Sequence, residues 1–83
     1  MKLIYSAWLS ERLEKSDEFI EIDNEISVRS LMELLANKGS SYSSVFKNTG
    51  IIKASVNGKV ISLETIITTK TEEIIFFAPI AGG

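Results

Sequence analysis

The most regular pattern of apolar positions lies in the middle of the chain and predicts an α-helix. Apolar residues recur there at three- and four-residue spacing, which places them on one face of a helix. They are Val28, Leu31, Met32 and Leu35, and Leu34 widens the face. Ser27 can cap this helix by accepting a backbone N–H bond, and Gly39 is a natural stop because it tolerates positive φ.

Further segments are rich in residues that favour β-strands. They are residues 2–9, 18–23, 51–56, 59–63 and 74–77. Asn57-Gly58 joins the third segment to the fourth and predicts a hairpin, because both positions of the tight turn need positive φ. The first and last segments are the most apolar, so we expect them at the centre of a sheet. The long crossover between them permits parallel pairing.

The connecting segments are less regular. Residues 10–16 are polar and predict one helical turn, while residues 40–50 are rich in Ser and predict a short irregular segment or helical turn. Residues 64–71 form a connection. Pro79 has no backbone N–H, so the last strand is expected to end at or near Ala78.

Together these elements predict an α+β fold. One amphipathic helix laid across one mixed sheet of about five strands is an economical way to bury both apolar faces. With its first and last strands parallel and adjacent, this is the ubiquitin-like β-grasp arrangement. A chain of 83 residues is long enough for a single domain, so we expect one domain at 1–83 with a flexible tail at 79–83.

Composition narrows the chemistry that side chains can supply. The chain has no Cys and no His, which excludes disulfides, thiolate or imidazole metal ligands and Cys or Ser-His-Asp nucleophiles. A net charge of −2 and a pI near 5.1 argue against nucleic-acid binding, which usually needs a basic patch. The sequence shows no signal peptide and no apolar run near the roughly 18 residues of a membrane span, so we expect a cytoplasmic protein.

Acidic residues cluster in and after the second predicted strand. Five acids and no base lie between Asp17 and Glu25. In the alternating pattern Ile20 and Ile22 point one way and Phe19 points the other. We interpret the cluster as a solvated edge strand whose charges discourage aggregation, and an acidic docking face is the alternative.

The C-terminus is the most distinctive part of the sequence. No constellation of side chains looks catalytic, but the chain stops at Gly82-Gly83 shortly after Pro79. Two terminal glycines arise by chance in roughly 0.5% of chains, taking glycine usage as about 7%. A frayed terminus is the alternative, but the preceding apolar strand and proline favour a carboxylate presented on a flexible stalk.

Three stretches resemble one known family. The run Ile-Ile-Phe-Phe-Ala-Pro-Ile-Ala-Gly-Gly at 74–83 is similar to the ending of molybdopterin synthase small subunits, which belong to the MoaD/ThiS sulfur-carrier family. Ala-Ser-Val-Asn-Gly at 54–58 and Tyr-Ser-Ala-Trp-Leu-Ser-Glu at 5–11 resemble family patterns as well. The chain departs from the family at 70–74, where a tight Gly turn is usual, and near Glu14-Lys15, where a Gly is usual.

The resemblance implies a carrier that is not an enzyme on its own. An adenylyltransferase of the E1-like class would use ATP to convert the Gly83 carboxylate to an acyl-adenylate, and a sulfur donor would replace AMP to leave a thiocarboxylate. The tail would then enter the large catalytic subunit of molybdopterin synthase and donate sulfur to a cyclic pterin precursor of the molybdenum cofactor. The carrier would hold no permanent cofactor, and the related synthase is a heterotetramer.

The resemblance also implies a partner interface near the tail. The predicted interface residues are Trp8, Val60, Phe77, Pro79, Ile80 and Ala81. Phe77 and Val60 match positions where the family has apolar residues that face the partner. Trp8 is not implied by the resemblance and is inferred from the composition of the chain alone. Ordinary core packing is the alternative for these three residues, because the sequence does not settle which strand faces are exposed.

Three other interpretations stay open. The first is a sulfur carrier of the thiamine pathway, and the second is a ubiquitin-like modifier whose Gly83 forms an isopeptide bond with lysines of target proteins. The third is a plain β-grasp binding module with an incidental Gly-Gly end. Such a module would keep its function without Gly82 and Gly83, whereas any carrier would lose it.

Overall fold

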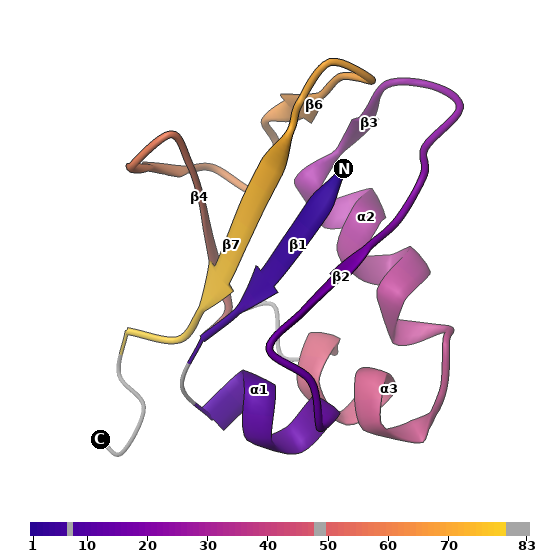
Figure 1. Cartoon of the computed structure of the whole chain (residues 1–83), viewed down its shortest axis with the longest axis vertical. Coiled ribbons are helices and arrows are strands. Elements are labelled where there is room, and N and C mark those ends of the chain that lie inside the picture. Colours follow the sequence, from indigo (N-terminus) through magenta and orange to yellow (C-terminus); the bar gives the residue numbers. More distant parts are fainter. Residues whose placement is uncertain (7, 48–49, 80–83) are drawn as a thin grey trace.

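The structure is a computed structural model that describes residues 1–6, 8–47 and 50–79 (Figure 1). The strands of the larger sheet are β1 (Lys2–Tyr5), β2 (Asp17–Phe19), β4 (Lys53–Val56), β5 (Lys59–Ile61) and β7 (Glu73–Phe77). Their order across the sheet is β2-β1-β7-β4-β5. A smaller sheet pairs β3 (Ile26–Ser27) with β6 (Ile66–Ile67). The helices are α1 (Trp8–Leu13), α2 (Val28–Ala36) and α3 (Ser40–Phe46).

The first and last strands lie side by side at the centre of the larger sheet and run parallel (Figure 1). Their register pairs Leu3 with Ile74 and Tyr5 with Phe76, and all four side chains are at most 2% exposed. β2 and β4 flank this pair and run antiparallel to it. The predicted α+β arrangement, a mixed five-strand β-grasp sheet with a helix packed across one face, is therefore confirmed.

Helix α2 matches the strongest prediction from the sequence. The Ser27 hydroxyl oxygen accepts a hydrogen bond from the Ser30 N–H at 3.0 Å and so caps the helix. The buried side chains of α2 are Val28, Leu31, Met32 and Leu35. Leu34, however, is 57% exposed, so it does not widen the buried face. The helix ends at Ala36, before the expected stop at Gly39, because the chain turns there toward α3.

The first strand is shorter than the sequence predicts. β1 ends at Tyr5, and α1 begins at Trp8, inside the segment expected to be strand. The Leu9 N–H donates to the Ser6 carbonyl at 3.1 Å, and both Leu9 and Leu13 are buried. Their four-residue spacing puts them on one face of a helix. The apolar run that predicts one long strand is therefore shared between a strand and a helix.

The other connections contain more structure than predicted. The helical turn expected at 10–16 is part of α1, which starts earlier, and residues 40–50 contain α3. The second strand is shorter than 18–23, because β2 spans Asp17–Phe19. The connection expected at 64–71 contains β6, which pairs with β3 through Ile66 and Ile67. Such two-residue pairings leave almost no periodic signal in a sequence.

The hairpin between β4 and β5 is confirmed. Asn57 has φ of 52° and Gly58 has φ of 79°, as the two central positions of this turn require. The turn sets Ala54 opposite Ile61 and Ser55 opposite Val60. This register decides which side of the sheet Val60 occupies.

Three aromatic rings lie at the centre of the core. The ring centroids of Phe46 and Phe76 are 5.3 Å apart in an edge-on arrangement, and the Tyr5 centroid lies 6.1 Å from Phe46 and 6.4 Å from Phe76. Aromatic pairs at these separations add to the stabilisation that burial provides. Since Tyr5 and Phe76 belong to the two central strands, the rings join α3 to the middle of the sheet.

Glu18 connects the edge strand β2 to the helices on the inner side of the sheet. Its Oε2 accepts hydrogen bonds from the hydroxyl groups of Tyr5 at 2.7 Å and Tyr42 at 2.8 Å. Its Oε1 accepts one from Lys38 Nζ at 2.7 Å, and Lys15 Nζ lies 3.6 Å away. The Glu18 side chain is 13% exposed. One carboxylate thus links β1, β2, α3 and the segment that follows α2.

These contacts shift the pKa of Glu18. Burial alone would raise it, but the hydrogen bonds from Lys38, Tyr5 and Tyr42 outweigh burial and lower the pKa from 4.5 to about 2. Burial and the hydrogen bond to Glu18 raise the pKa of Tyr5. A carboxyl group with a lower pKa in the folded state stabilises the fold above its unfolded pKa. This contribution is lost as the pH falls through the folded pKa.

The variant Glu18→Gln should lower the free energy of unfolding at pH 7 by about 2 kcal/mol, because hydrogen bonds to a charged group are worth ~1.5–3 kcal/mol. The deficit should shrink as the pH falls from 4.5 to about 2. Urea denaturation at several pH values measures both effects. The exposed neighbour gives the control Asp17→Asn, which should change stability by less than about 0.5 kcal/mol. A deficit of equal size at pH 7 and pH 2 would contradict the role given to the carboxylate charge.

Candidate functional site

The candidate site is built on the outer face of the larger sheet, on the side away from the core. Side chains alternate between the two faces of a strand. In β7, Ile74 and Phe76 are fully buried, so Ile75 and Phe77 project from the outer face, where both are partly exposed. The same alternation puts Ile4 of β1 on the outer face, since its neighbours Leu3 and Tyr5 are buried.

An apolar row crosses the outer face from strand to strand. The register sets Ile4 beside Ile75, Ile75 beside Ser55, and Ser55 beside Val60. Val60 is 65% exposed. Phe77 lies two residues after Ile75 on β7, on the same face, and pairs with Lys53 of β4. We call the set Ile4, Val60, Ile75 and Phe77 the outer-face patch.

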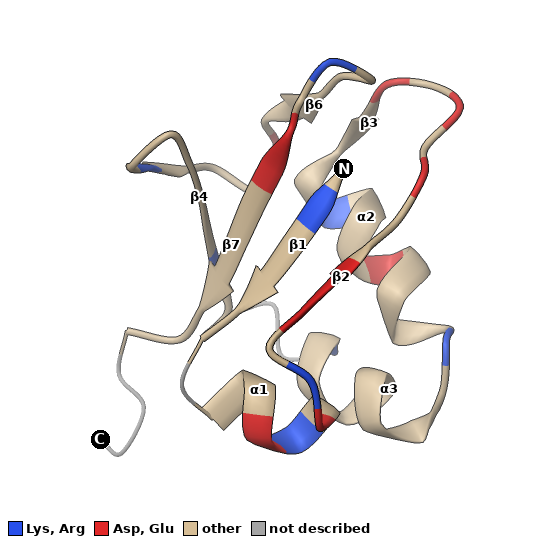
Figure 2. Ribbon diagram, in the orientation of Figure 1, with Lys and Arg blue, Asp and Glu red and all other residues tan. Residues whose placement is uncertain are grey.

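Charge is sparse along the two central strands, which carry three of the four patch residues, whereas Lys53 of β4 pairs with Phe77 and Lys59 precedes Val60 on β5. Lys2 and Glu73 are the charged residues of β1 and β7, and both stand at the start of their strands (Figure 2). The rest of each strand is uncharged as far as the end from which the tail leaves. Exposed apolar side chains that gather on one face are a feature of protein-binding sites, although Ser55 separates Ile75 from Val60 in this row.

The structure brings two of the predicted interface residues together. Phe77 and Val60 lie on the same face of the sheet, which the sequence could not settle. Ile4 and Ile75 share that face, although sequence reasoning did not single them out. Four consecutive apolar residues in β7 carry no alternation from which their faces could be assigned. The hairpin turn and the paired register supply that assignment.

Trp8 has a different setting. It is the first residue of α1, is partly buried against the core, and has the guanidinium of Arg12 5.6 Å from its ring centre. The Ser6 N–H, two residues earlier, donates to the Phe76 carbonyl at 3.1 Å. Trp8 therefore sits near the end of β7 from which the tail leaves, but on a helix and not in the outer-face patch.

The last described residues show how the chain leaves the sheet. β7 ends at Phe77, Ala78 is 8% exposed, and Pro79 is exposed. The sequence prediction that the ladder ends at or near Ala78 is confirmed. The predictions for Ile80, Ala81, Gly82 and Gly83 concern residues outside the described part of the chain. The tail thus departs from a central, paired strand next to the outer-face patch.

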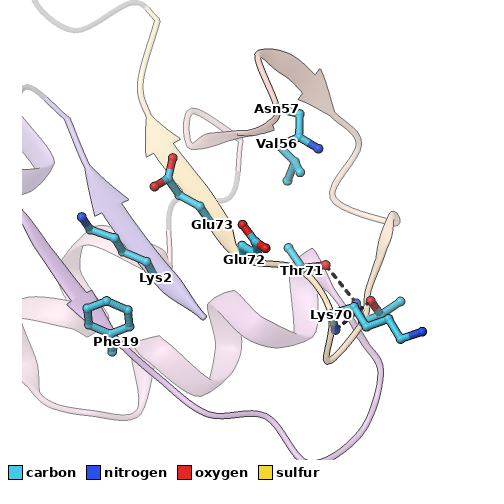
Figure 3. A pocket seen from close by; sticks show the side chains of 9 residues that line it. Lys2, Phe19, Val56, Asn57, Lys70, Thr71, Glu72 and Glu73 are labelled. Atoms are coloured by element: carbon cyan, nitrogen blue, oxygen red, sulfur yellow. Dashed lines mark hydrogen bonds between the residues drawn. The ribbon is translucent and has the colours of Figure 1, made fainter.

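A shallow groove lies at the other end of the sheet (Figure 3). Its volume is about 750 Å³. Its lining includes Lys2, Phe19, Asn57 and the start of β7 at Glu72 and Glu73. Glu73 and the end of β7 are separated by about 13 Å at ~3.3 Å per strand residue. The groove therefore does not adjoin the point where the tail departs.

Other types of site are not found in the described residues. Within 1–6, 8–47 and 50–79, no group of acidic side chains is arranged to hold a metal ion. In the same residues no helix has the length and apolar character needed to cross a bilayer.

Comparison with known protein families shows to which family this chain belongs. The model of the ThiS family matches residues 3–83. The chain belongs to the ThiS family. Small ubiquitin-like proteins of the ThiS family act as sulfur carriers, are generally not catalytic themselves, and interact with E1-like activating enzymes and partner enzymes. The predicted membership of the MoaD/ThiS group is thereby confirmed at the level of the family.

Comparison with known structures supports the fold. SAMP1 from Haloferax volcanii has a crystal structure that is similar to this ThiS-family chain with a TM-score of 0.75. The two share 24% sequence identity over 100% of this chain and 98% of SAMP1. At this identity the likeness shows the β-grasp fold alone. A search of curated proteins found no significant match.

Proposed function

We propose that this chain is the sulfur-carrying small subunit of a molybdopterin synthase, with the Gly83 carboxylate as its reactive group. The observation that carries the proposal is the placement of the C-terminal strand. β7 is central, is paired on both sides, and ends beside the outer-face patch before Pro79 and the Gly82-Gly83 terminus. Membership of the ThiS family supports the carrier role.

The chemistry begins at an activating enzyme of the E1-like class. The Gly83 carboxylate oxygen attacks the α-phosphorus of ATP, pyrophosphate leaves, and an acyl-adenylate forms. A donor that supplies sulfur at the oxidation level of sulfide then attacks the carbonyl carbon, and AMP leaves with the bonding electron pair. The product is a C-terminal thiocarboxylate. ATP is a substrate of the activating enzyme, and the carrier itself holds no permanent cofactor.

Sulfur is then delivered inside a partner. The tail enters the active site of the large catalytic subunit and passes sulfur to a cyclic pterin precursor. Glycine suits the tip of a tail in a narrow channel, because it lacks a Cβ and accepts any backbone angle that the channel imposes. A channel filled by Ile80, Ala81 and Gly82 also keeps water away from the activated carbonyl of Gly83.

The division of labour follows from the composition. The chain has no Cys and no His, so it offers neither a thiol that could hold persulfide sulfur nor an imidazole base. The terminal carboxylate is then the sulfur-bearing group, and the acid and base groups come from the partner. The carrier is a cytoplasmic subunit, and the synthase pairs two carriers with two large subunits.

Partner binding is assigned to the outer-face patch. Val60 is exposed on the edge strand β5, and Phe77, at the end of β7, is partly exposed on the same face. The partly buried Trp8 and the exposed Pro79 lie near the end of β7 and would add to the contact. Desolvated aromatic and aliphatic anchors of this kind contribute most of the binding energy in many interfaces. Binding here would hold the tail in line with the partner's channel.

A test of tail insertion is the variant Gly83→Ala. The added methyl group should leave the free energy of unfolding unchanged, because the sequence predicts a tail that adds nothing to the core. It should slow sulfur transfer by about 10-fold to 100-fold, since small misplacements at a reacting centre carry costs of this size. Product formation in a synthase reconstituted with the large subunit measures the rate. Gly39→Ala is the matched control, because no heavy atom lies within 4 Å of a Cβ placed there.

If Gly83→Ala transferred sulfur at the same rate as Gly39→Ala, tail insertion would be wrong. If the chain without Gly82 and Gly83 kept its cellular role, the plain binding module would replace the carrier. Conjugates between Gly83 and lysines of other proteins, with no thiocarboxylate, would favour the modifier. A thiocarboxylate that supplies only thiazole synthesis would favour the thiamine-pathway carrier.

A test of the interface compares two exposed apolar residues on opposite sides of the sheet. Val60→Glu should weaken binding of the purified large subunit by at least about tenfold, because it places a charge in an apolar contact. Leu34→Glu is the control. Leu34 is 57% exposed on α2, against 65% for Val60, and should leave the affinity unchanged. Isothermal titration calorimetry measures both, and equal affinities for the two variants would remove Val60 from the interface.

A further inference from the structure

Strand β2 forms one edge of the larger sheet, and its hydrogen-bond register shows which backbone groups face outward. The Ile20 N–H donates to the Met1 carbonyl at 2.9 Å, and the Tyr5 N–H donates to the Ser16 carbonyl at 2.8 Å. Residues 16 and 20 therefore direct their backbone groups toward β1. Because this direction alternates along a strand, Glu18 does so as well.

Asp17 and Phe19 consequently turn their backbone N–H and C=O groups away from the sheet. Nothing in the described part of the chain hydrogen-bonds to these groups. Their backbone groups form a short template on which another extended chain can pair, as happens when a peptide adds a strand to a sheet edge. The two residues set the register that such a chain would adopt.

Phe19 makes this edge unusual. Its side chain is 76% exposed, more than any other large apolar side chain in the described residues. It lies across from Lys2 and lines the groove at the far end of the sheet (Figure 3). Asp17 is a charge of the kind that protects an edge strand against pairing with its own copies. The phenyl ring of Phe19, the last residue of β2, adds to this edge the kind of apolar anchor that interfaces use.

The charges around Phe19 specify what can bind there. Asp17, Glu21, Asp23 and Glu25 are exposed and form no salt bridge with any described residue. Figure 2 shows acidic positions along β2 and the segment that follows it. Five of the eleven acids lie in 17–25, so the rest of the chain, with nine basic and six acidic residues, has a net charge of +3. The acidic edge is thus a local field on a chain that is otherwise mildly basic.

This field argues against a second copy of the chain as the occupant. Antiparallel pairing of two β2 edges would bring the carboxylates of one copy against those of the other, and like charges across a strand pair are destabilising. An extended segment rich in Lys or Arg has the opposite sign. It would satisfy the outward backbone groups of Asp17 and Phe19 and place basic side chains near Asp17 and Glu21.

We propose that the outer edge of β2 binds an extended, basic segment of a partner protein by strand addition, with Phe19 as the apolar anchor. This site goes beyond the proposed carrier function. β2 and β5 are the opposite edges of the sheet, so the β2 edge is separate from Val60. Asp17 pairs with Ile4 of the outer-face patch, whereas Phe19 pairs with Lys2, at the end of the sheet opposite to the one where the tail departs. The chain can therefore hold a basic partner segment while its tail is engaged elsewhere.

The test uses the full chain, labelled with ¹⁵N, and the peptide acetyl-Lys-Val-Lys-Val-Lys-Val-Lys-amide as the probe. The probe should shift the amide resonances of Asp17 and Phe19 and slow their hydrogen exchange. Phe19→Ser should weaken binding by about tenfold or more, and so should raising the salt to about 0.5 M, which shortens the screening length. Val60→Ser, on the opposite edge, should bind the probe like the unmodified chain. The peptide with Glu in place of Lys should not bind.

Several results would overturn the proposal. These are no binding of the lysine peptide, equal affinity for Phe19→Ser, or shifts confined to Ile75 and Val60. Shifts of the β2 amides that depend on protein concentration without peptide would assign the edge to a second copy instead. Thiocarboxylate formation by Phe19→Ser should match that of the unmodified chain, so failure of this proposal is distinct from failure of the carrier function.

Discussion

The parallel pairing of β1 with β7 is the contact on which the rest of the architecture depends. It joins the first and last strands at the centre of the sheet and gives each an inner and an outer face. The inner residues, among them Tyr5 and Phe76, form the core with the helices, while Ile4 and Ile75 are left on the outer face. Because β7 is held on both sides, the chain leaves the sheet at a fixed place beside an apolar surface. The proposed reactive group at Gly83 would gain from this, since groups held by rigid elements are positioned most precisely.

The sequence predicts much of this fold because its strongest signals are local. The spacing of apolar residues in α2 and the Asn57-Gly58 turn each define an element without reference to the rest of the chain. The sequence-based predictions are wrong where tertiary contacts determine the local structure. Leu9 and Leu13 belong to a helix that follows β1 too closely for its period to stand apart from the strand, and the β3–β6 pair is too short to leave a pattern.

Only part of the candidate site can be predicted from the sequence. Gly82-Gly83 can be recognised in the sequence, because the chemistry proposed for it uses the terminal carboxylate and no other side chain of this chain. The surface beside it needs the register of β7 with β4 and of β4 with β5, which puts Val60 and Phe77 on one face. Glu18 is the clearest case of a residue whose role the sequence does not reveal. In the sequence it is one of several acids in a solvated strand, yet in the structure three separate segments donate hydrogen bonds to it.

The most direct test of the carrier function is the intact mass of the chain isolated with its activating enzyme and sulfur donor. Replacing one oxygen with sulfur raises the mass by nearly the same amount as adding one oxygen. Oxidation of Met1 or Met32 can therefore imitate it. An alkylating reagent specific for thioacids separates the two. The carrier function predicts an alkylated thiocarboxylate on the C-terminal peptide, at Gly83. An unmodified carboxylate, when the same enzymes load a known carrier, would contradict it.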